Sequence, residues 1–226
     1  MDPAPDAPAR SLVGVPTRES LLTDAAVQEP HVLLPPGTGR RVHVLTEVEI
    51  GIGRPDIVVV AYSPRALDAL LRRSLRISNL TEARLLAALL SNGPQDPWRA
   101  AGITRSHGRR KERQLADRGW LSRDVVGATP KVVGDSLLVE AKVSSWRAGL
   151  LQLVRTRGLA HRAALLVSAE SAPRVDRRAL RKYGVGLLTY APGHGVHWVR
   201  RSTFRGVRLA SELWLGELVA RSVTTR

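Results

Sequence analysis

An acidic and a basic residue lie two positions apart in a run, 136–143, whose other residues are typical of a buried strand. They are Glu140 and Lys142. Successive strand side chains point to opposite faces, so these two share one face while Val139 and Ala141 pack on the other. A carboxylate beside an ammonium is either a structural ion pair or a metal ligand with an adjacent proton-transfer group.

A second carboxylate follows from the hairpin that residues 41–62 predict. Residues 41–50 alternate like a half-buried strand, a glycine turn follows, and residues 55–62 form an apolar strand that opens with Asp56. If this hairpin neighbours the Glu140 strand, Asp56, Glu140 and Lys142 converge at one edge of a sheet. Two carboxylates suit Mg²⁺ or Mn²⁺, which would lower the pKa of a bound water and neutralise charge on a phosphate. Lys142 would orient or deprotonate that water, or stabilise developing negative charge.

The composition indicates a polyanionic partner. The chain has 226 residues, a net charge of +15 and a pI near 11.5, and nucleic acid is the first candidate for such a field. No apolar run approaches the ~20 residues of a membrane span, and the N-terminus lacks the apolar region of a signal peptide. The absence of cysteine excludes disulfides and thiolate metal sites and agrees with a cytoplasmic protein. Residues 1–16 are rich in Pro, Ala and Asp, and we expect them to be disordered.

The second half of the chain alternates strands and helices, which predicts an α/β sheet with parallel neighbours. We expect strands at 136–143, 163–168 and 184–190, with another near 197–200, and helices at 145–157, 173–183 and 211–221. In the first half we expect a helix at 18–28 and a loop at 30–39.

At this point the chain resembles the PD-(D/E)XK nuclease superfamily, which has the restriction-endonuclease-like fold. The resemblance lies in Gly53-Arg-Pro-Asp56-Ile-Val-Val and in Val139-Glu140-Ala-Lys142-Val, followed by a helix and a strand in the family's order. It covers about residues 41–62 and 130–192. It implies that Asp56 and Glu140 bind the metal and that Lys142 serves the attacking water.

Two further positions follow from the same resemblance. The family often has an acid just upstream of the Asp, which Glu47 or Glu49 would supply, the alternative being that they are surface charges. Recombinase-type members carry a Gln followed four residues later by Tyr. Here Gln152 is followed by Thr156, so half of that motif is present.

Some 83 residues separate Asp56 from Glu140, and the excess is a helical block that resembles an inserted winged helix-turn-helix. Its helices are expected at 80–91, 97–103 and 106–118, with a wing starting at Gly119-Trp-Leu121. Residues 72–124 hold 12 basic and five acidic residues, so the block carries nearly half of the net charge. The third helix of such modules enters the major groove. This predicts DNA contacts from Ser106, His107, Arg109, Arg110, Lys111 and Arg113. The alternative is that these residues form a solvated face. The basic helix at 173–183 is either a second DNA surface or a solvated one.

These observations predict a restriction-endonuclease-like α/β fold, a mixed sheet flanked by helices, with an inserted winged helix-turn-helix. The nuclease-like core would comprise residues 17–71 and 127–226, and the insert residues 72–126. The expected function is a metal-dependent DNA endonuclease acting on duplex DNA, as a homodimer if it cuts both strands. The alternatives are a non-catalytic DNA-binding regulator built on the nuclease scaffold and a structure-specific nuclease acting on branched or single-stranded nucleic acid.

Overall fold

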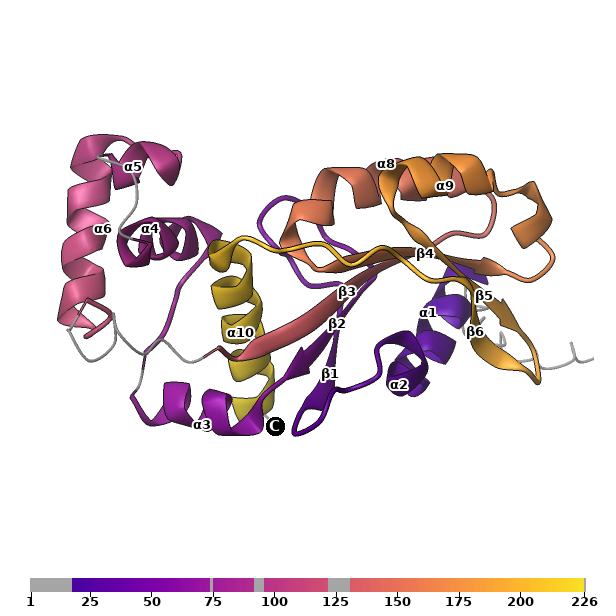
Figure 1. Cartoon of the computed structure of the whole chain (residues 1–226), viewed down its shortest axis with the longest axis horizontal. Helices are drawn as coiled ribbons and strands as arrows, with labels where there is room; N and C mark the ends of the chain where they lie inside the picture. The colour runs from indigo at the N-terminus through magenta and orange to yellow at the C-terminus, as the bar shows by residue number, and fades with distance from the viewer. Residues whose placement is uncertain (1–17, 74, 92–95, 122–130, 226) are drawn as a thin grey trace, which may run out of the picture.

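Six strands form one mixed sheet in the order in which they occur along the chain (Figure 1). A computed structural model describes residues 18–73, 75–91, 96–121 and 131–225. β1, β2 and β3 are antiparallel neighbours, β3, β4 and β5 are parallel, and β6 returns antiparallel to β5. The expected hairpin, its pairing with the Glu140 strand and the parallel second half are therefore confirmed. The strands are β1 (Arg41–Thr46), β2 (Ile57–Tyr62), β3 (Val133–Ala141), β4 (Arg162–Ser168), β5 (Gly186–Ala191) and β6 (Gly195–Arg200).

Helices cover both faces of the sheet and bury the alternating apolar residues of its strands (Figure 1). One face packs on α1 (Arg18–Gln28) and α2 (Pro30–Leu33). The other packs on α3 (Pro64–Arg72), α8 (Trp146–Thr156), α9 (Arg177–Tyr183) and α10 (Leu209–Thr224), with short 3₁₀ turns at Arg157–Leu159 and Ala172–Arg174. None of the helices in the described ranges has the length and hydropathy that a bilayer span requires.

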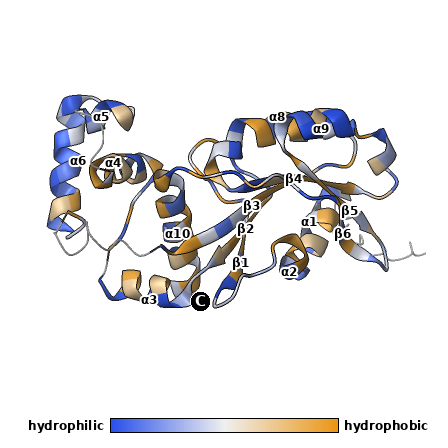
Figure 2. Cartoon of the chain, in the orientation of Figure 1, coloured by the Kyte–Doolittle hydropathy of each residue, from blue (hydrophilic) through white to orange (hydrophobic). Residues whose placement is uncertain are grey.

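The helical block between β2 and β3 extends the core rather than forming a separate one. It contains α4 (Leu80–Leu90), α5 (Pro97–Ala100) and α6 (Arg105–Asp117), and its buried Leu85, Leu115 and Trp120 belong to the same apolar cluster as the sheet. α10, at the end of the chain, packs on α4 and on the strands, so it joins the block to the sheet. Figure 2 shows the contrast between the apolar strands and the hydrophilic α6. The wing was expected to start at residues 119–121, which form a turn after α6. Its continuation over residues 122–130 and the disorder expected at 1–16 lie outside the described residues.

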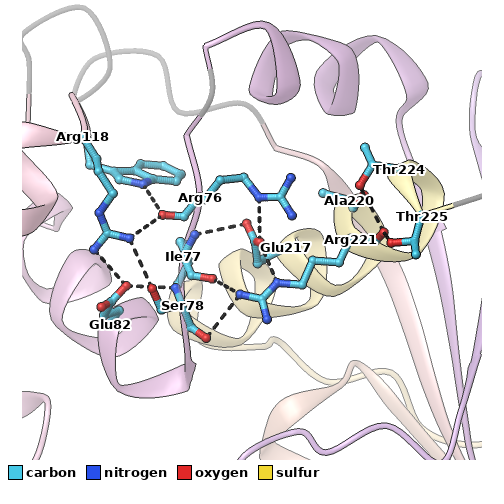
Figure 3. A network of polar contacts seen from close by, with 11 residues as sticks. Arg76, Ile77, Ser78, Glu82, Arg118, Glu217, Ala220, Arg221, Thr224 and Thr225 are labelled. Carbon is cyan, nitrogen blue, oxygen red and sulfur yellow. Dashed lines mark hydrogen bonds and ion pairs between the residues drawn. The ribbon is translucent and has the colours of Figure 1, made fainter.

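Two buried glutamates hold the segment that leads into the helical block (Figure 3). The carboxylate of Glu217, on α10, accepts hydrogen bonds from Arg76 Nε at 2.9 Å, Ile77 N at 3.1 Å and Arg221 Nε at 2.8 Å. A buried charge is costly unless it is paired and hydrogen-bonded, and here it has three donors. The connection between α3 and α4 is thereby fixed to α10.

The second glutamate is Glu82, on α4, and its side chain is 3% exposed. It accepts hydrogen bonds from Ser78 N at 2.9 Å, Lys111 Nζ at 3.0 Å and Arg118 Nη2 at 3.1 Å. Burial raises the pKa of the Glu82 carboxyl, but these donors and the two cations outweigh it and the net pKa is lowered. The pair of glutamates therefore fixes the orientation of α4 and α6 relative to α10.

Several expectations about local structure were wrong. The helix expected at 97–103 ends at Ala100, the helix expected at 173–183 begins at Arg177, and the strand expected at 136–143 spans Val133–Ala141. Residues 30–39 were expected to be a loop, but they begin with the four-residue helix α2, because Pro30 at its first position favours helix initiation. The first strand was expected to reach residue 50 and ends at Thr46. The chain leaves the strand at Glu47, which has a φ of 49°, in the left-handed region that few non-glycine residues adopt.

Candidate active site

Asp56, Glu140 and Lys142 converge at the edge where β2 begins and β3 ends. Ile57 pairs with Val139 across the antiparallel strands, which places Asp56 beside the end of β3. Lys142 Nζ lies 3.0 Å from Glu140 Oε1 and 3.8 Å from Asp56 Oδ2. Two carboxylates thus face one ammonium group, as the sequence predicted.

The position of Asp56 is fixed by the backbone at the end of β3, the strand that carries Glu140 and directly precedes Lys142. Its Oδ2 accepts a hydrogen bond of 2.7 Å from Ala141 N. Burial raises the pKa of the Asp56 carboxyl, and the charges of Glu19 and Glu47 raise it further, whereas the Ala141 hydrogen bond and Lys142 lower it. The balance leaves the pKa raised, with burial as the main cause.

Glu140 is the most strongly perturbed group of the site. Its side chain is 1% exposed, and burial is the main reason why its pKa rises to about 7, although the hydrogen bond from Lys142 opposes the rise. Its Oε1 accepts that hydrogen bond. The Asp56 backbone N–H also lies near the carboxyl group and lowers the pKa slightly, but it does not meet hydrogen-bond geometry, and the buried Oε2 has no hydrogen-bond partner among the described residues. A buried carboxylate oxygen without a donor is costly and marks a place where a cation would be stabilising.

Lys142 remains a cation in this setting. Burial lowers the pKa of its ammonium group, but the hydrogen bond to Glu140 and the charges of Glu140, Asp56 and Glu19 outweigh burial, so the net pKa is raised. The side chain is therefore protonated at neutral pH. It is suited to donating hydrogen bonds and stabilising negative charge rather than to removing a proton.

Glycine at position 149 lets α8 lie directly against the site. A Cβ there would lie 2.7 Å from Leu165 Cδ1, 2.8 Å from Lys142 Cγ and 3.4 Å from Glu140 Cγ. These contacts also confirm that Glu140 and Lys142 lie on the α8 face of β3. The face of α8 turned to the site therefore has no room for a side chain at this position.

We expect Gly149→Ala to lower the turnover of a reaction at this site about tenfold or more, because the new methyl group displaces Lys142 or the helix. Gly206→Ala is the control, since a Cβ at Gly206 meets nothing within 4 Å. Turnover and thermal unfolding of both variants should be measured together. Equal turnover in the two variants would show that the approach of α8 does not position the site.

A third carboxylate, which the sequence did not predict, reaches the site from α1. Glu19 Oε2 lies 3.7 Å from Lys142 Nζ, and its side chain is 47% exposed. α1 packs against the face of the sheet opposite α8, close to β3 and β4. The sequence predicted the helix correctly, but nothing in its spacing indicates that its first turn lies beside Lys142.

The acids expected upstream of Asp56 occupy a loop instead of one face of a strand. Glu47 Oε2 forms an exposed ion pair of 2.8 Å with Arg54 Nη2. Glu49 Oε1 accepts a hydrogen bond of 2.8 Å from Gly51 N. The reason is the left-handed turn at Glu47. Within the described residues, neither carboxylate forms a hydrogen bond or ion pair with Glu140 or Lys142, and each has a structural partner within the loop.

Gln152 supports the same loop. Its Nε2 donates a hydrogen bond of 3.3 Å to Arg54 O, which ties α8 to the segment that leads into Asp56. Thr156, four residues later, donates its hydroxyl hydrogen to Gln152 O and is buried within the helix. Gln152, the part of the recombinase-type motif that is present on α8, therefore helps to position the loop that leads into Asp56.

A small pocket beside Lys142 has a mixed lining that includes a second cation, Arg174. Its volume is about 20 Å³, and it is lined in part by Lys142, Ser144, Trp146, Ser171 and Arg174. Ser171 Oγ donates a hydrogen bond of 3.1 Å to Val143 O, which fixes the loop after β4 against the end of β3. Arg174 is exposed and forms no ion pair within the described ranges. Cationic and hydroxyl groups thus continue from the three site residues toward α9.

The residues of α6 expected to contact DNA divide into two groups. Ser106, Arg109, Arg110 and Arg113 are exposed, and His107 is partly exposed. Arg109 also lies over the Trp98 ring at 5.8 Å.

Lys111 does not fit the expectation for this helix. It points inward to the buried Glu82, and its side chain is 15% exposed. Its placement therefore does not support a DNA contact, because its charge is used to satisfy a buried carboxylate.

The donor set fits a hard divalent cation held by few protein ligands. Among the described residues, no group of three or more His, Cys, Asp or Glu side chains could hold a metal. Mg²⁺, however, commonly takes only one or two carboxylates and keeps water and substrate oxygens in its other positions. Asp56 and Glu140 supply two carboxylates, and the buried Glu140 Oε2 has no hydrogen-bond partner among the described residues.

Comparison with known proteins adds no family. No protein-family model and no curated protein sequence matches the chain. One similar solved structure is an SPO1766 protein of unknown function from Silicibacter pomeroyi, which is 11% identical over 95% of this chain and 90% of that one, with a TM-score of 0.43. A similarity of this strength carries no argument about fold family or activity.

Proposed function

We propose that the protein is a Mg²⁺-dependent nuclease that hydrolyses phosphodiester bonds in DNA. The observation that carries the proposal is the convergence of Asp56, Glu140 and Lys142, with a buried oxygen of Glu140 left without a donor. A purely structural ion pair would not require a second carboxylate on the same ammonium or an unsatisfied oxygen. A net charge of +15 fits a polyanionic substrate.

Asp56 and Glu140 would hold the metal. The Glu19 carboxylate lies close enough to Lys142 to add negative charge to the same site. When bound, Mg²⁺ would lower the pKa of a coordinated water and neutralise charge on the scissile phosphate. The Ala141 N–H holds Asp56 in place for this role, and burial keeps bulk water away from Glu140. The two ligands are thus preorganised by strand pairing and backbone hydrogen bonding.

Lys142 would stabilise the negative charge that develops on the phosphate. Because the pKa of Lys142 is raised, its ammonium group has a proton to donate at neutral pH and is not a base. Arg174, at the same small pocket, is placed to contact a neighbouring phosphate of the substrate. The exposed arginines of α6 would add contacts to the duplex farther along.

The direct test is cleavage of labelled DNA with Mg²⁺ and with EDTA. Duplex, branched and single-stranded substrates should be compared, because the site chemistry is the same for all three. Cleavage that requires Mg²⁺ supports the proposal, and preference among the substrates then separates an endonuclease on duplexes from a structure-specific enzyme. Tight duplex binding without cleavage of any substrate would instead indicate a DNA-binding regulator.

Metal affinity should depend on pH, because a proton and Mg²⁺ compete for Glu140. With a Glu140 pKa of about 7, the Mg²⁺ concentration for half-maximal cleavage should rise about tenfold for each pH unit below 7 and be nearly constant above pH 8. The measurement is a Mg²⁺ titration of the cleavage rate at several pH values. A half-maximal concentration that is unchanged between pH 8 and pH 6 would contradict the assignment of Glu140 as a ligand.

A further inference from the structure

An open groove separates the helical block from the sheet domain. Its volume is about 820 Å³. Its walls are α4 and α5 on one side and the beginning of α10 on the other, and residues from the 3₁₀ turn after α8 and from the loop before Asp56 complete it. Figure 1 shows that these segments meet where the block joins the sheet.

The groove is cationic. Arg84, Arg99 and Arg208 line it and are exposed, and none of its lining residues is an Asp or Glu. In the described part of the chain no ion pair involves any of these three arginines, unlike Arg76, Arg118 and Arg221 nearby. Three unneutralised guanidinium groups facing one space attract an anion, and their planar donors match phosphate oxygens.

Many of the remaining lining residues have small side chains, which leave room for a ligand to lie close to the backbone of the groove walls. Ala87, Ala88, Ala100, Ala101 and Gly102 make up much of the α4 and α5 wall. Arg208 precedes α10, which is 16 residues long, so the positive end of that helix dipole faces the same space as the arginines. The arginines, rather than the helix end, carry most of the positive charge.

The groove is connected to the active site through one loop. Ile52 lines the groove with a side chain that is 45% exposed, and Asp56 lies four residues later in the same loop. A Cβ on the neighbouring Gly51 would lie 2.8 Å from Leu80 Cδ2, so the loop packs tightly on α4, and Gln152 holds its other end through Arg54 O. Glu217 and Glu82 fix the segment between α3 and α4 and thereby the separation of the two walls (Figure 3).

We propose that this groove binds the sugar-phosphate backbone of the DNA strand on one side of the bond that is cut. The inference rests on the proposed nuclease function and adds a surface that α6 does not include. Arg84, Arg99 and Arg208 each contact a phosphate, and the groove directs the strand toward the loop that ends at Asp56. The contacts are to phosphates, so they confer affinity and position rather than sequence preference.

The test compares two triple variants that lose the same charge. Arg84→Gln/Arg99→Gln/Arg208→Gln alters the groove. The control is Arg65→Gln/Arg72→Gln/Arg73→Gln, which alters two exposed residues of α3 and the exposed residue that follows it. α3 lies beside the opposite end of α10 from the groove (Figure 1). Circular dichroism and thermal unfolding establish that both variants fold.

Binding of labelled DNA is measured in EDTA, where cleavage does not occur, over a range of salt concentrations. We expect the groove variant to lose about 10- to 100-fold in affinity, and its salt slope to fall by about two to three relative to wild type. The α3 control should keep its affinity within about threefold. Equal losses in both variants, or no loss in the groove variant, would overturn the groove proposal.

A second measurement locates the DNA directly. The chain has no cysteine, so Ala88→Cys places a single photo-crosslinker in the groove, and Ala69→Cys, on α3, places one away from it. The groove label should crosslink to DNA and the α3 label should not. If the labelled Ala88→Cys protein crosslinks to DNA but neither it nor the wild-type protein cleaves, the groove proposal is retained and the nuclease proposal is removed. Wild-type cleavage without crosslinking from Ala88→Cys does the reverse. A wild-type protein that binds no DNA overturns both.

Discussion

Lys142→Ala is expected to reduce Mg²⁺-dependent cleavage about 10³-fold while leaving DNA affinity within a few-fold of wild type. Within the described ranges, Lys142 is the one cation that pairs with both carboxylates of the site, and its raised pKa keeps it charged at neutral pH. Its contribution should therefore appear when negative charge develops on the phosphate, not when DNA first binds. Single-turnover rates and binding isotherms, measured separately, distinguish the two.

Lys131→Ala is the matched control. Lys131 precedes the same strand, is 67% exposed and lies 3.7 Å from Glu212, at the opposite end of β3 from Lys142. It should keep nearly full cleavage activity. If both variants lost activity equally, or if the loss in Lys142→Ala followed DNA affinity, Lys142 would be one of many charges that bind DNA and not part of the reaction.

Glu140→Gln is expected to raise the free energy of unfolding by about 3 kcal/mol at pH 8 in EDTA, while abolishing Mg²⁺-dependent cleavage. The pKa of Glu140 is about 7 in the folded protein against an ordinary value of 4.5, so the folded state holds the proton more tightly. Wild-type stability should therefore fall as pH rises from about 4.5 to 7 on account of this group. The neutral glutamine should remove this loss of stability with rising pH. Denaturant unfolding of both proteins from pH 4.5 to 8 measures the difference.

Glu82→Gln is the control with the opposite sign. The pKa of Glu82 is lowered in the folded protein, so its charged form stabilises the fold above the unfolded pKa and this stabilisation is lost as pH falls. The glutamine variant should be less stable than wild type by about 3 kcal/mol at pH 8, because Lys111 and Arg118 lose their buried partner. Destabilisation of similar size by both substitutions would show that Glu140 is a structural carboxylate like Glu82.

The contrast between these two glutamates favours an enzyme over a regulator that only retains the scaffold. Glu82 has three donors and stabilises the fold, whereas Glu140 has one unpartnered buried oxygen and destabilises it at neutral pH. A fold without a metal would be more stable with an amide or apolar residue at position 140. Proteins commonly accept this kind of local cost at functional sites.

Much of the sheet could be predicted from sequence because its signals are local, and the convergence of Asp56, Glu140 and Lys142 followed from the expected pairing of two such strands. The apolar run from Ile57 to Tyr62 is buried at every position, and the two-residue spacing of Glu140 and Lys142 fixes their common face. α1 has the predicted bounds and α4 ends one residue before its predicted end, since the pattern of each helix is contained within it.

The remaining site features depend on contacts between distant segments. Glu19 reaches Lys142 because α1 packs across β3, and the two residues lie far apart in sequence. Lys111 was expected to contact DNA because of its basic neighbours, but its partner Glu82 belongs to another helix. Glu47 left the expected strand through a left-handed turn that the alternating pattern does not reveal.

The central claim is tested most directly by incubating supercoiled plasmid DNA with wild-type protein and with Asp56→Asn, in Mg²⁺ and in EDTA. Asparagine keeps the shape of Asp56 but removes the charge that would help hold the metal. The account predicts nicked or linear products from wild-type protein in Mg²⁺ alone, and none from Asp56→Asn or in EDTA. Cleavage by Asp56→Asn at the wild-type rate would contradict it, as would the failure of wild-type protein to cut duplex, branched or single-stranded DNA.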